Sequence, residues 1–404
     1  MWARAALACL TTLVAGCASV PARPDRARIT PDELLAARPF GLTQDSPTPV
    51  EEKEVLAVSD GMRAFLDEHV ARGATRNVRL RQLAMAIVGR GDFRLEYDET
   101  TRTAAKTFQT RHGNCLSFSN MFVAMARHMG LEAYFQEVET PPDWSVKGDA
   151  FVLNRHVNVL VDLGGGIGQQ ERLASLVRST ASEGQHVVDF NMDDFRTSYD
   201  RRVVSDARAL AHYYNNVGVE RMQAGERAAA LGNFRKAAAN DPSFSPTWTN
   251  LGLLYMRNGH AAHAEAAHLQ ALKADPSDLV AMSNLASLYE RQGDRERAAA
   301  YRERVVAHRN RNPYYRFQLA REAFDAGDYD AAIRYLNDAT RKKNNEDQFY
   351  FLLGMSYLKK GDPKAARRWI SRAEEVAATD ALKRRYASKM DILLPPPPEV
   401  EKPK

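Results

Sequence analysis

Apolar side chains recur along this chain with two spacings, and each spacing predicts one kind of secondary structure. From residue 55 onward, many recur every three or four positions, which is the spacing of one helix face. One such face predicts a helix over 115–129 that ends at Gly130; its apolar residues are Phe118, Met121, Phe122, Met125 and Met129. Alternating or continuous apolar runs predict strands at 93–97, 132–138, 151–163 and 186–190. A helix that leads into several strands indicates an α+β domain over residues 51–205.

From about residue 211 the pattern changes to a repeat of 34 residues. The period is carried by five glycines, Gly225, Gly259, Gly293, Gly327 and Gly361. One repeat resembles the tetratricopeptide (TPR) signature at Trp248, Leu251, Gly252, Tyr255, Ala264, Ala271 and Pro276. We therefore expect five TPR repeats over 211–380 that form an all-α superhelical solenoid. A capping helix is expected at 381–394, and the Pro-rich tail at 395–404 is expected to be disordered.

The first 50 residues have the features of an export signal and a tether. Arg4 precedes an apolar stretch over 5–15, and the residues that end at Cys17 resemble a bacterial lipobox. That resemblance implies a signal peptide over 1–16 and a lipid on Cys17. The alternatives are an ordinary signal peptide cut near Ala18 or a single-span anchor, for which the apolar stretch is short. Residues 17–50 are rich in proline and polar residues and are expected to tether the fold to the lipid.

The expected location follows from the same segment. Ala18, and not an aspartate, follows the lipobox cysteine. Under the Gram-negative sorting rule, this residue favours the periplasmic face of the outer membrane. The protein is therefore expected in the cell envelope, attached to the membrane only by its N-terminal lipid.

The charge pattern bears on nucleic-acid binding, and the cysteine content bears on the role of Cys115. The net charge is +5, and Lys and Arg are interspersed with Asp and Glu without a basic, aromatic-rich run. Nucleic acid is therefore not expected as a partner. Of the three cysteines, Cys9 would leave with the signal and Cys17 would carry lipid. Cys115 is then the only thiol of the mature protein. A free thiol in an exported protein has no disulfide partner and is a candidate reactive group.

Cys115 lies where a thiol becomes reactive. Asn114 is a good N-cap for the helix over 115–129, so Cys115 falls in the first helical turn. There, unpaired amides and the helix dipole favour an anion and lower the pKa of a thiol. The structural alternative is a buried, inert cysteine.

Residues 93–190 resemble the transglutaminase-like superfamily, whose active-site design is related to papain-type cysteine proteases. The resemblance is carried by Tyr97 and by ordered blocks at 101–104, 111–115, 127–133, 154–159 and 187–189. It implies that Cys115 is the nucleophile, that His156 is its general base, and that Asp189 orients the imidazole. The implied fold is an α+β, papain-like domain followed by the all-α TPR solenoid.

The partner of His156 has two further candidates. Asp162 lies six residues further along the predicted strand, about 20 Å away at ~3.3 Å per residue, which is too far to orient the ring. Asn158 shares the face of His156 and is a weaker candidate. Asp189, on the following strand, can pair beside His156, although an insertion at 164–186 lengthens the interval between them.

The repeats indicate a protein or peptide partner. Asn216, Asn250 and Asn284 recur in register on the first helix of three repeats, at a position that often faces the groove in relatives. Arg257 and Arg291, also in register, would add charge nearby. The alternative is that these asparagines only follow the repeat consensus.

These features predict an exported lipoprotein that acts on amide bonds of a peptide or protein through a thioester. The reaction is hydrolysis or acyl transfer, and TPR repeats would bind the partner or substrate. The alternative is a non-catalytic scaffold or assembly lipoprotein whose transglutaminase-like domain is inactive. No cofactor is expected. A zinc site among His112, His128, His156 and His186 would lack a tight ligand pair, and no Asp-rich loop supports calcium.

Overall fold

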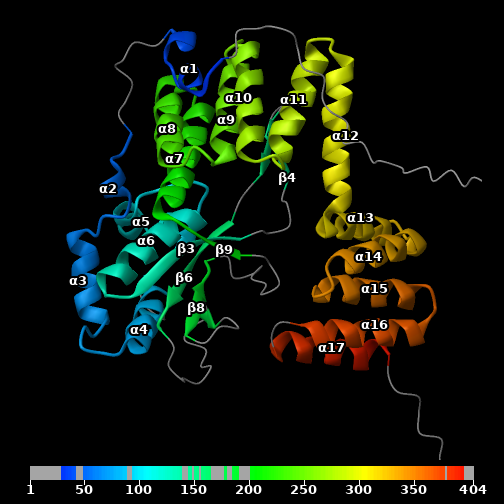
Figure 1. The fold of residues 1–404 in the computed structure, drawn as a ribbon. Helices are drawn as coiled ribbons and strands as arrows, with labels where there is room; N and C mark the ends of the chain where they lie inside the picture. The colour runs from blue at the N-terminus through cyan, green and yellow to red at the C-terminus, as the bar shows by residue number, and fades with distance from the viewer. Residues whose placement is uncertain are drawn as a thin grey trace, which may run out of the picture.

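A computed structural model describes residues 29–41, 49–88, 93–138, 144–147, 150–153, 156–164, 177–179, 184–190, 201–377 and 380–394. Figure 1 shows a mixed N-terminal region of helices and strands, followed by a run of helices that continues to the C-terminus. The predicted signal peptide, Cys17 and the predicted disordered tail lie outside the described residues. Within the described ranges, no helix has the length and apolar character needed to cross a bilayer.

The N-terminal domain is built around one antiparallel sheet. Its strands lie in the order β7-β8-β6-β3-β9. They span Val177–Ser179, Gln185–Val188, His156–Asp162, Glu132–Val138 and Arg201–Val204. The helices span Glu52–Val55 (α2), Asp60–His69 (α3), Arg76–Val88 (α4), Ala104–Thr110 (α5) and Cys115–His128 (α6). The expected α+β class is confirmed.

One predicted strand is divided in the structure. The apolar run over 151–163 predicts a single strand, whereas the chain forms β5 (Ala150–Leu153) and β6 (His156–Asp162). β5 pairs with β4 (Trp144–Lys147) in a separate hairpin, and β6 enters the main sheet beside β3. Residues 154 and 155 lie outside the described ranges. The hairpin lies against solenoid helix α11 (Figure 1). The first part of the apolar run therefore packs on the solenoid, and the second part belongs to the main sheet.

Helix α6 is the central element of this domain. Its apolar residues Met121, Phe122 and Met125 are buried in one core with Val157 and Val159 of β6. Gly130 follows the helix with a φ of 71°, a left-handed conformation that glycine adopts without steric cost. The predicted helix end is confirmed, and the packing fixes α6 on the sheet.

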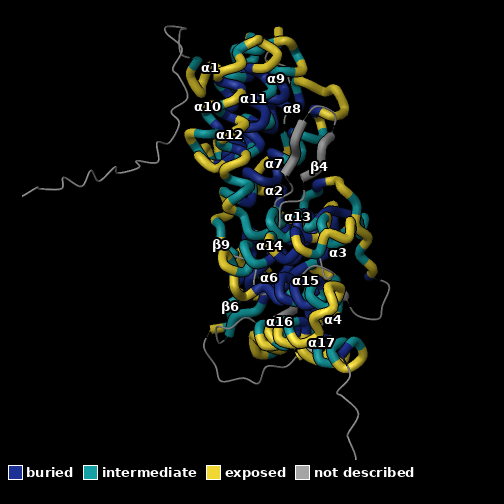
Figure 2. The backbone as a smooth tube through the Cα atoms, turned by 90° about the vertical axis from the view of Figure 1, so that its right-hand side faces the viewer, coloured by how far each residue is buried: buried dark blue, intermediate teal, exposed yellow. Residues whose placement is uncertain are grey.

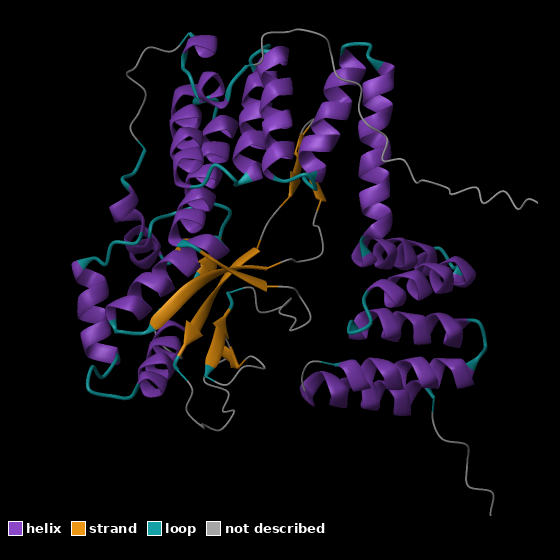
Figure 3. Cartoon of the chain, in the orientation of Figure 1, coloured by secondary structure: helices purple, strands orange, loops and turns teal. Residues whose placement is uncertain are grey.

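The solenoid consists of helix pairs that repeat with the predicted period (Figure 3). Its first six helices are Asp206–Gln223 (α7), Arg227–Asn240 (α8), Ser245–Arg257 (α9), Ala261–Ala274 (α10), Leu279–Arg291 (α11) and Arg295–Arg311 (α12). The remaining helices are Pro313–Asp325 (α13), Tyr329–Lys342 (α14), Asp347–Lys359 (α15), Pro363–Val376 (α16) and Asp380–Leu393 (α17). The five recurring glycines have φ values from 76° to 81°, so each makes the turn between paired helices in a conformation that disfavours a side chain. Helix α17 lies where the capping helix is predicted.

The first solenoid helix is joined to the sheet by buried charges. The Glu137 carboxylate of β3 accepts hydrogen bonds from His212 Nε2 of α7 at 2.7 Å and from Arg202 Nη2 of β9 at 2.6 Å. Arg208 Nε of α7 lies 3.3 Å from the same carboxylate. Burial opposes ionisation of Glu137, but these contacts hold the pKa of its carboxyl well below the usual value. Helix α7 is therefore fixed to the N-terminal domain by a compensated buried charge.

Part of the predicted tether is packed on the solenoid. Residues 29–41 form α1 (Pro31–Leu34) and a short 3₁₀ helix, η1 (Arg38–Phe40). Leu34 is buried, and its carbonyl accepts a 2.7 Å hydrogen bond from Tyr255 Oη of α9. Phe40 stacks on Tyr255 with ring centroids 4.6 Å apart. The side chains of Leu34 and Phe40 therefore pack on the second repeat, and residues 29–41 are attached to the solenoid surface.

His268 of α10 occupies an apolar site inside the second repeat. It is fully buried, like the core positions that fill the solenoid in Figure 2, and neither ring nitrogen has a hydrogen-bond partner among the described residues. A Cβ at Gly252 would lie 2.5 Å from the ring. One period earlier, Phe234 packs on Gly218 in the same way. Burial lowers the pKa of His268 to about 3, so the ring is neutral at physiological pH.

We expect the variant His268→Phe to remove an acid sensitivity of the fold. The pKa of His268 is about 3 in the folded protein and ~6.5 in an unfolded chain. The unfolded state therefore binds more protons between these values, and stability falls as the pH decreases below ~6.5. At about pH 5, this one group lowers the free energy of unfolding by about 2 kcal/mol. Thermal unfolding at about pH 7.5 and pH 5 should show a smaller decrease for His268→Phe than for the wild type. The exposed His128 provides the control His128→Gln, and equal decreases in all three proteins would contradict this role of His268.

Candidate active site

Cys115 lies at the start of α6 because a tight turn delivers the chain there. β1 (Glu96–Tyr97) and β2 (His112–Gly113) pair in parallel just before the helix. A Cβ at Gly113 would lie 2.5 Å from the Cβ of Ser117, so only glycine allows this approach. The strand predicted over 93–97 is shorter in the structure, because only its last two residues, Glu96 and Tyr97, pair with another strand.

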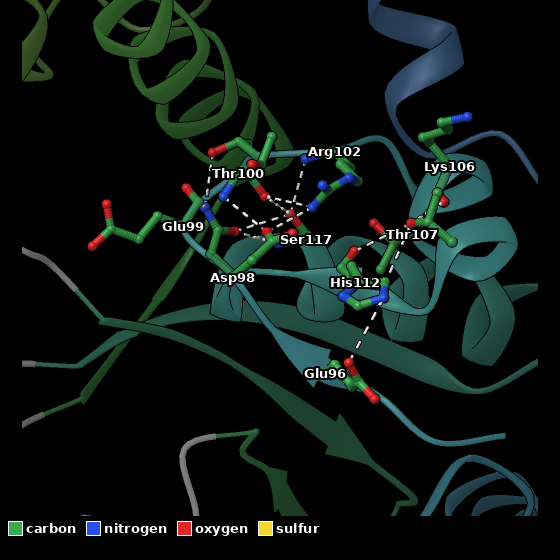
Figure 4. Close-up of polar contacts among 12 residues, drawn as sticks. Glu96, Asp98, Glu99, Thr100, Arg102, Lys106, Thr107, His112 and Ser117 are labelled. Atoms are coloured by element: carbon green, nitrogen blue, oxygen red, sulfur yellow. Dashed lines mark hydrogen bonds and ion pairs between the residues drawn. The ribbon is translucent and has the colours of Figure 1, made fainter. Parts of the chain in front are cut away.

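A polar network fixes the first turn of α6. Asn114 is the N-cap, and its Oδ1 accepts a 2.9 Å hydrogen bond from the backbone N–H of Ser117. Its Nδ2 donates to Thr101 Oγ1 at 2.8 Å. Figure 4 shows Ser117 beside Arg102, whose backbone N–H donates to Ser117 Oγ at 2.9 Å. The loop before α5 and the first turn of α6 therefore hold each other in place.

His156 and Asp189 form a close pair. His156 Nε2 lies 2.8 Å from Asp189 Oδ1 and 3.0 Å from Asp189 Oδ2. Both side chains are largely buried, with exposed fractions of 12% and 4%. His156 also hydrogen-bonds Cys115. Because Asp189 uses Nε2, Nδ1 is the ring nitrogen left for the thiol. The structure therefore brings together the three residues that the sequence resemblance selects.

The charges of this group favour a thiolate and an imidazolium. Burial raises the pKa of the Cys115 thiol, but the hydrogen bond and charge of His156, together with a hydrogen bond from the Val157 backbone, lower that pKa overall. Burial alone would lower the pKa of His156, whereas its hydrogen bonds to Asp189 and Cys115 raise it to about 10. Cys115 as a residue is half-buried.

The two rival partners of His156 have other positions. Asp162 Oδ1 accepts a 2.9 Å hydrogen bond from the backbone N–H of Gly164, at the far end of β6. Asn158 is fully buried, and its Nδ2 donates to Asp189 Oδ2 at 2.8 Å. Val159 pairs with Val188 in the β6–β8 register, and this places Asn158 opposite Asp189. Asn158 therefore supports Asp189 instead of replacing it.

The sequence reasoning missed two residues that support the site, Thr101 and Ser117. Their contacts with Asn114 and Arg102 cross between the loop and the helix. A serine three residues after the N-cap and a threonine in the motif block at 101–104 are the only local signals. Neither reveals a contact across the turn.

The predicted groove residues of the solenoid have mixed environments. Asn250 is half-buried and donates from Nδ2 to Asn215 Oδ1 at 2.9 Å. Asn284 of α11 is buried, whereas Asn216 is half-buried. The hydrogen bond of Asn250 favours a role in helix packing, whereas Nδ2 of the buried Asn284 has no hydrogen-bond partner among the described residues. The two arginines, Arg257 and Arg291, are exposed. Within the described part of the chain, no three His, Cys, Asp or Glu side chains are grouped closely enough to hold a metal ion.

Comparisons with solved structures find repeat proteins. The structure titled "Crystal structure of MamA protein" has 19% sequence identity and a TM-score of 0.23, and the match covers 46% of this chain and 97% of that one. YrrB, titled a TPR protein with an unusual peptide-binding site, has 20% identity and a TM-score of 0.23, covering 44% and 92%. Pseudomonas aeruginosa pilF has 15% identity and a TM-score of 0.25, covering 48% and 96%.

Family models match both parts of the chain, and no curated protein matches it. The model of the transglutaminase-like superfamily matches residues 63–163, which include Cys115 and His156. Tetratricopeptide repeat models match residues 245–278, 281–314 and 317–381. The first helix pair, α7 and α8, precedes these matches but has the same glycine turn. The chain therefore contains a transglutaminase-like domain followed by C-terminal tetratricopeptide repeats.

Proposed function

We propose that this protein is a cysteine-dependent enzyme that acts on amide bonds of a peptide or protein through a thioester at Cys115. The observation that carries the proposal is the contact of His156 with both Cys115 and Asp189, which lowers the pKa of the thiol. A buried, inert cysteine would have no such base beside it. The products of the reaction are those of hydrolysis or of acyl transfer.

The reaction proceeds in two halves. The Cys115 thiolate attacks the carbonyl carbon of the amide, and a C–S bond forms as the carbonyl oxygen gains negative charge. The backbone N–H of Cys115, at the start of α6, is a donor for this oxygen. His156 gives its proton to the leaving amine as the C–N bond breaks, which leaves a thioester. Water or a second amine then attacks the thioester, His156 accepts the proton, and the Cys115 thiolate is released.

The TPR repeats support protein or peptide binding. In our proposal, the solenoid binds the substrate or a protein partner and so brings it to the N-terminal domain. The exposed Arg257 and Arg291 are candidate contacts. The candidate asparagines are the half-buried Asn216 and the buried Asn284, whose Nδ2 has no hydrogen-bond partner among the described residues.

We further propose that the protein is lipidated on Cys17 and lies on the periplasmic face of the outer membrane. The support is the lipobox-like sequence that ends at Cys17 and the alanine that follows it. Metabolic labelling with a fatty-acid analogue, followed by membrane fractionation, tests this proposal. Loss of both label and membrane association in Cys17→Ala supports it, and unchanged labelling contradicts it.

We expect Cys115 to react with iodoacetamide at a pH far below the pKa of an ordinary thiol, which is about 8.5. The reason is that His156 stabilises the thiolate. The extent of alkylation is measured at Cys115 by peptide mass spectrometry across pH, so that Cys9 and Cys17 do not contribute. The variant His156→Ala should show the profile of an ordinary thiol. An ordinary profile in the wild type would overturn the enzymatic proposal and favour the scaffold function.

Substitution of Asp189 should reduce the reactivity of Cys115 at about pH 6 by about tenfold or more, which corresponds to one pKa unit. In Asp189→Ala, burial lowers the pKa of His156 without the compensating hydrogen bond, so the imidazolium no longer stabilises the thiolate. The matched control is Asp162→Ala, because Asp162 lies at the other end of β6. Equal effects of both variants would contradict the assignment of Asp189.

A further inference from the structure

One side chain of the solenoid reaches the loop that supports the candidate nucleophile. Glu220, near the end of α7, accepts a 2.8 Å hydrogen bond at Oε1 from the backbone N–H of Thr101. The Thr101 hydroxyl also hydrogen-bonds this carboxylate. Thr101 is buried, with 6% of its surface exposed, so water does not readily replace Glu220 as its partner.

Thr101 connects Glu220 to the helix that carries Cys115. Its Oγ1 accepts a 2.8 Å hydrogen bond from Asn114 Nδ2, and Asn114 Oδ1 accepts from the backbone N–H of Ser117 at 2.9 Å. Cys115 lies between Asn114 and Ser117 in this turn. A continuous chain of hydrogen bonds therefore runs from the solenoid to the first turn of α6.

The position of Glu220 is set by contacts that α7 makes earlier along its length. His212, eight residues earlier and about 12 Å away along the helix, is bonded to the buried Glu137 of β3. Tyr213 and Tyr214 of the same helix belong to the core of the N-terminal domain. Helix α7 cannot shift along the domain without breaking these contacts, so Glu220 is held facing the loop.

The charge of Glu220 alone would not assist the thiolate. A negative group near Cys115 opposes its ionisation, and burial raises the pKa of Glu220 against the effect of the Thr101 hydrogen bonds. The benefit of a half-buried carboxylate here therefore lies in its hydrogen bonds and not in its charge.

We propose that Glu220 is a positioning residue of the active site, supplied by the first solenoid repeat, which holds the first turn of α6 and Cys115 against His156. The proposal rests on the proposed function, because it concerns the reactivity of the same cysteine. It adds that the solenoid contributes to the geometry of the site as well as to binding.

The test uses the full chain with the variants Glu220→Ala, Glu220→Gln and Thr101→Val. Glu220→Ala removes the acceptor, Glu220→Gln keeps an acceptor oxygen without the charge, and Thr101→Val removes the hydroxyl with little change in volume. Glu226→Ala is the matched control, since Glu226 is exposed and pairs with Arg221 at 2.9 Å. Circular dichroism and thermal unfolding identify any variant that fails to fold.

Two measurements are made on each folded variant. Hydrogen exchange reports the protection of amides over 114–118, and iodoacetamide alkylation reports the pH profile of Cys115. We expect Glu220→Ala and Thr101→Val to exchange faster at 114–118 and to alkylate more slowly at about pH 6, by about threefold or more, the size expected for a lost capping hydrogen bond. Glu220→Gln should restore most of both values, and Glu226→Ala should match the wild type.

The outcomes separate the two proposals. Unchanged exchange over 114–118 in Glu220→Ala and Thr101→Val overturns the role of Glu220, whatever the thiol does. Faster exchange with an unchanged Cys115 profile also overturns it, because Glu220 would then stabilise the loop without positioning the sulfur. An ordinary thiol profile in the wild type overturns the proposed function, and the exchange data still report whether Glu220 holds the turn.

Discussion

The capped start of α6 is the constraint on which the candidate active site depends. The first amides of a helix have no partners within it, and here Asn114 satisfies one of them through Ser117. The remaining amides and the helix dipole are left to favour negative charge at Cys115. Gly113 permits the close turn that places the cysteine there. A looser turn would leave the thiol near His156 only part of the time.

The sheet and the solenoid are joined by buried charges, each of which would be destabilising without its partners. Glu137 is buried, yet three basic side chains from β9 and α7 surround its carboxylate. Removal of one partner from such a group leaves an uncompensated charge and is strongly destabilising. The contact therefore specifies how α7 lies on the sheet more than it adds to net stability, and the adjacent tyrosines supply the apolar burial.

Local patterns in the sequence account for the elements and for the three central residues, but not for the long-range contacts. The alternation over 132–138 predicts β3, and the 34-residue glycine period predicts the helix turns. Ordered motif blocks select Cys115, His156 and Asp189. The division between β5 and β6 was not predictable, because one apolar run continues through both strands. Glu137–His212 and Thr101–Glu220 join residues 75 and 119 positions apart, and such contacts leave no periodic signal.

Helix α7 has a consequence for how this pair of domains can be separated or exchanged. It completes the core of the N-terminal domain and also forms the first helix pair of the solenoid with α8. A cut at the apparent boundary before α7 would expose Tyr213, Tyr214 and the carboxylate of Glu137. A joint after α8 would keep the first repeat with the N-terminal domain. The second and third repeats would still contact the N-terminal part of the chain, through Leu34 and Phe40 on Tyr255 of α9 and through β5 on α11. An exchange of repeats that leaves the N-terminal domain intact must therefore preserve these surfaces as well.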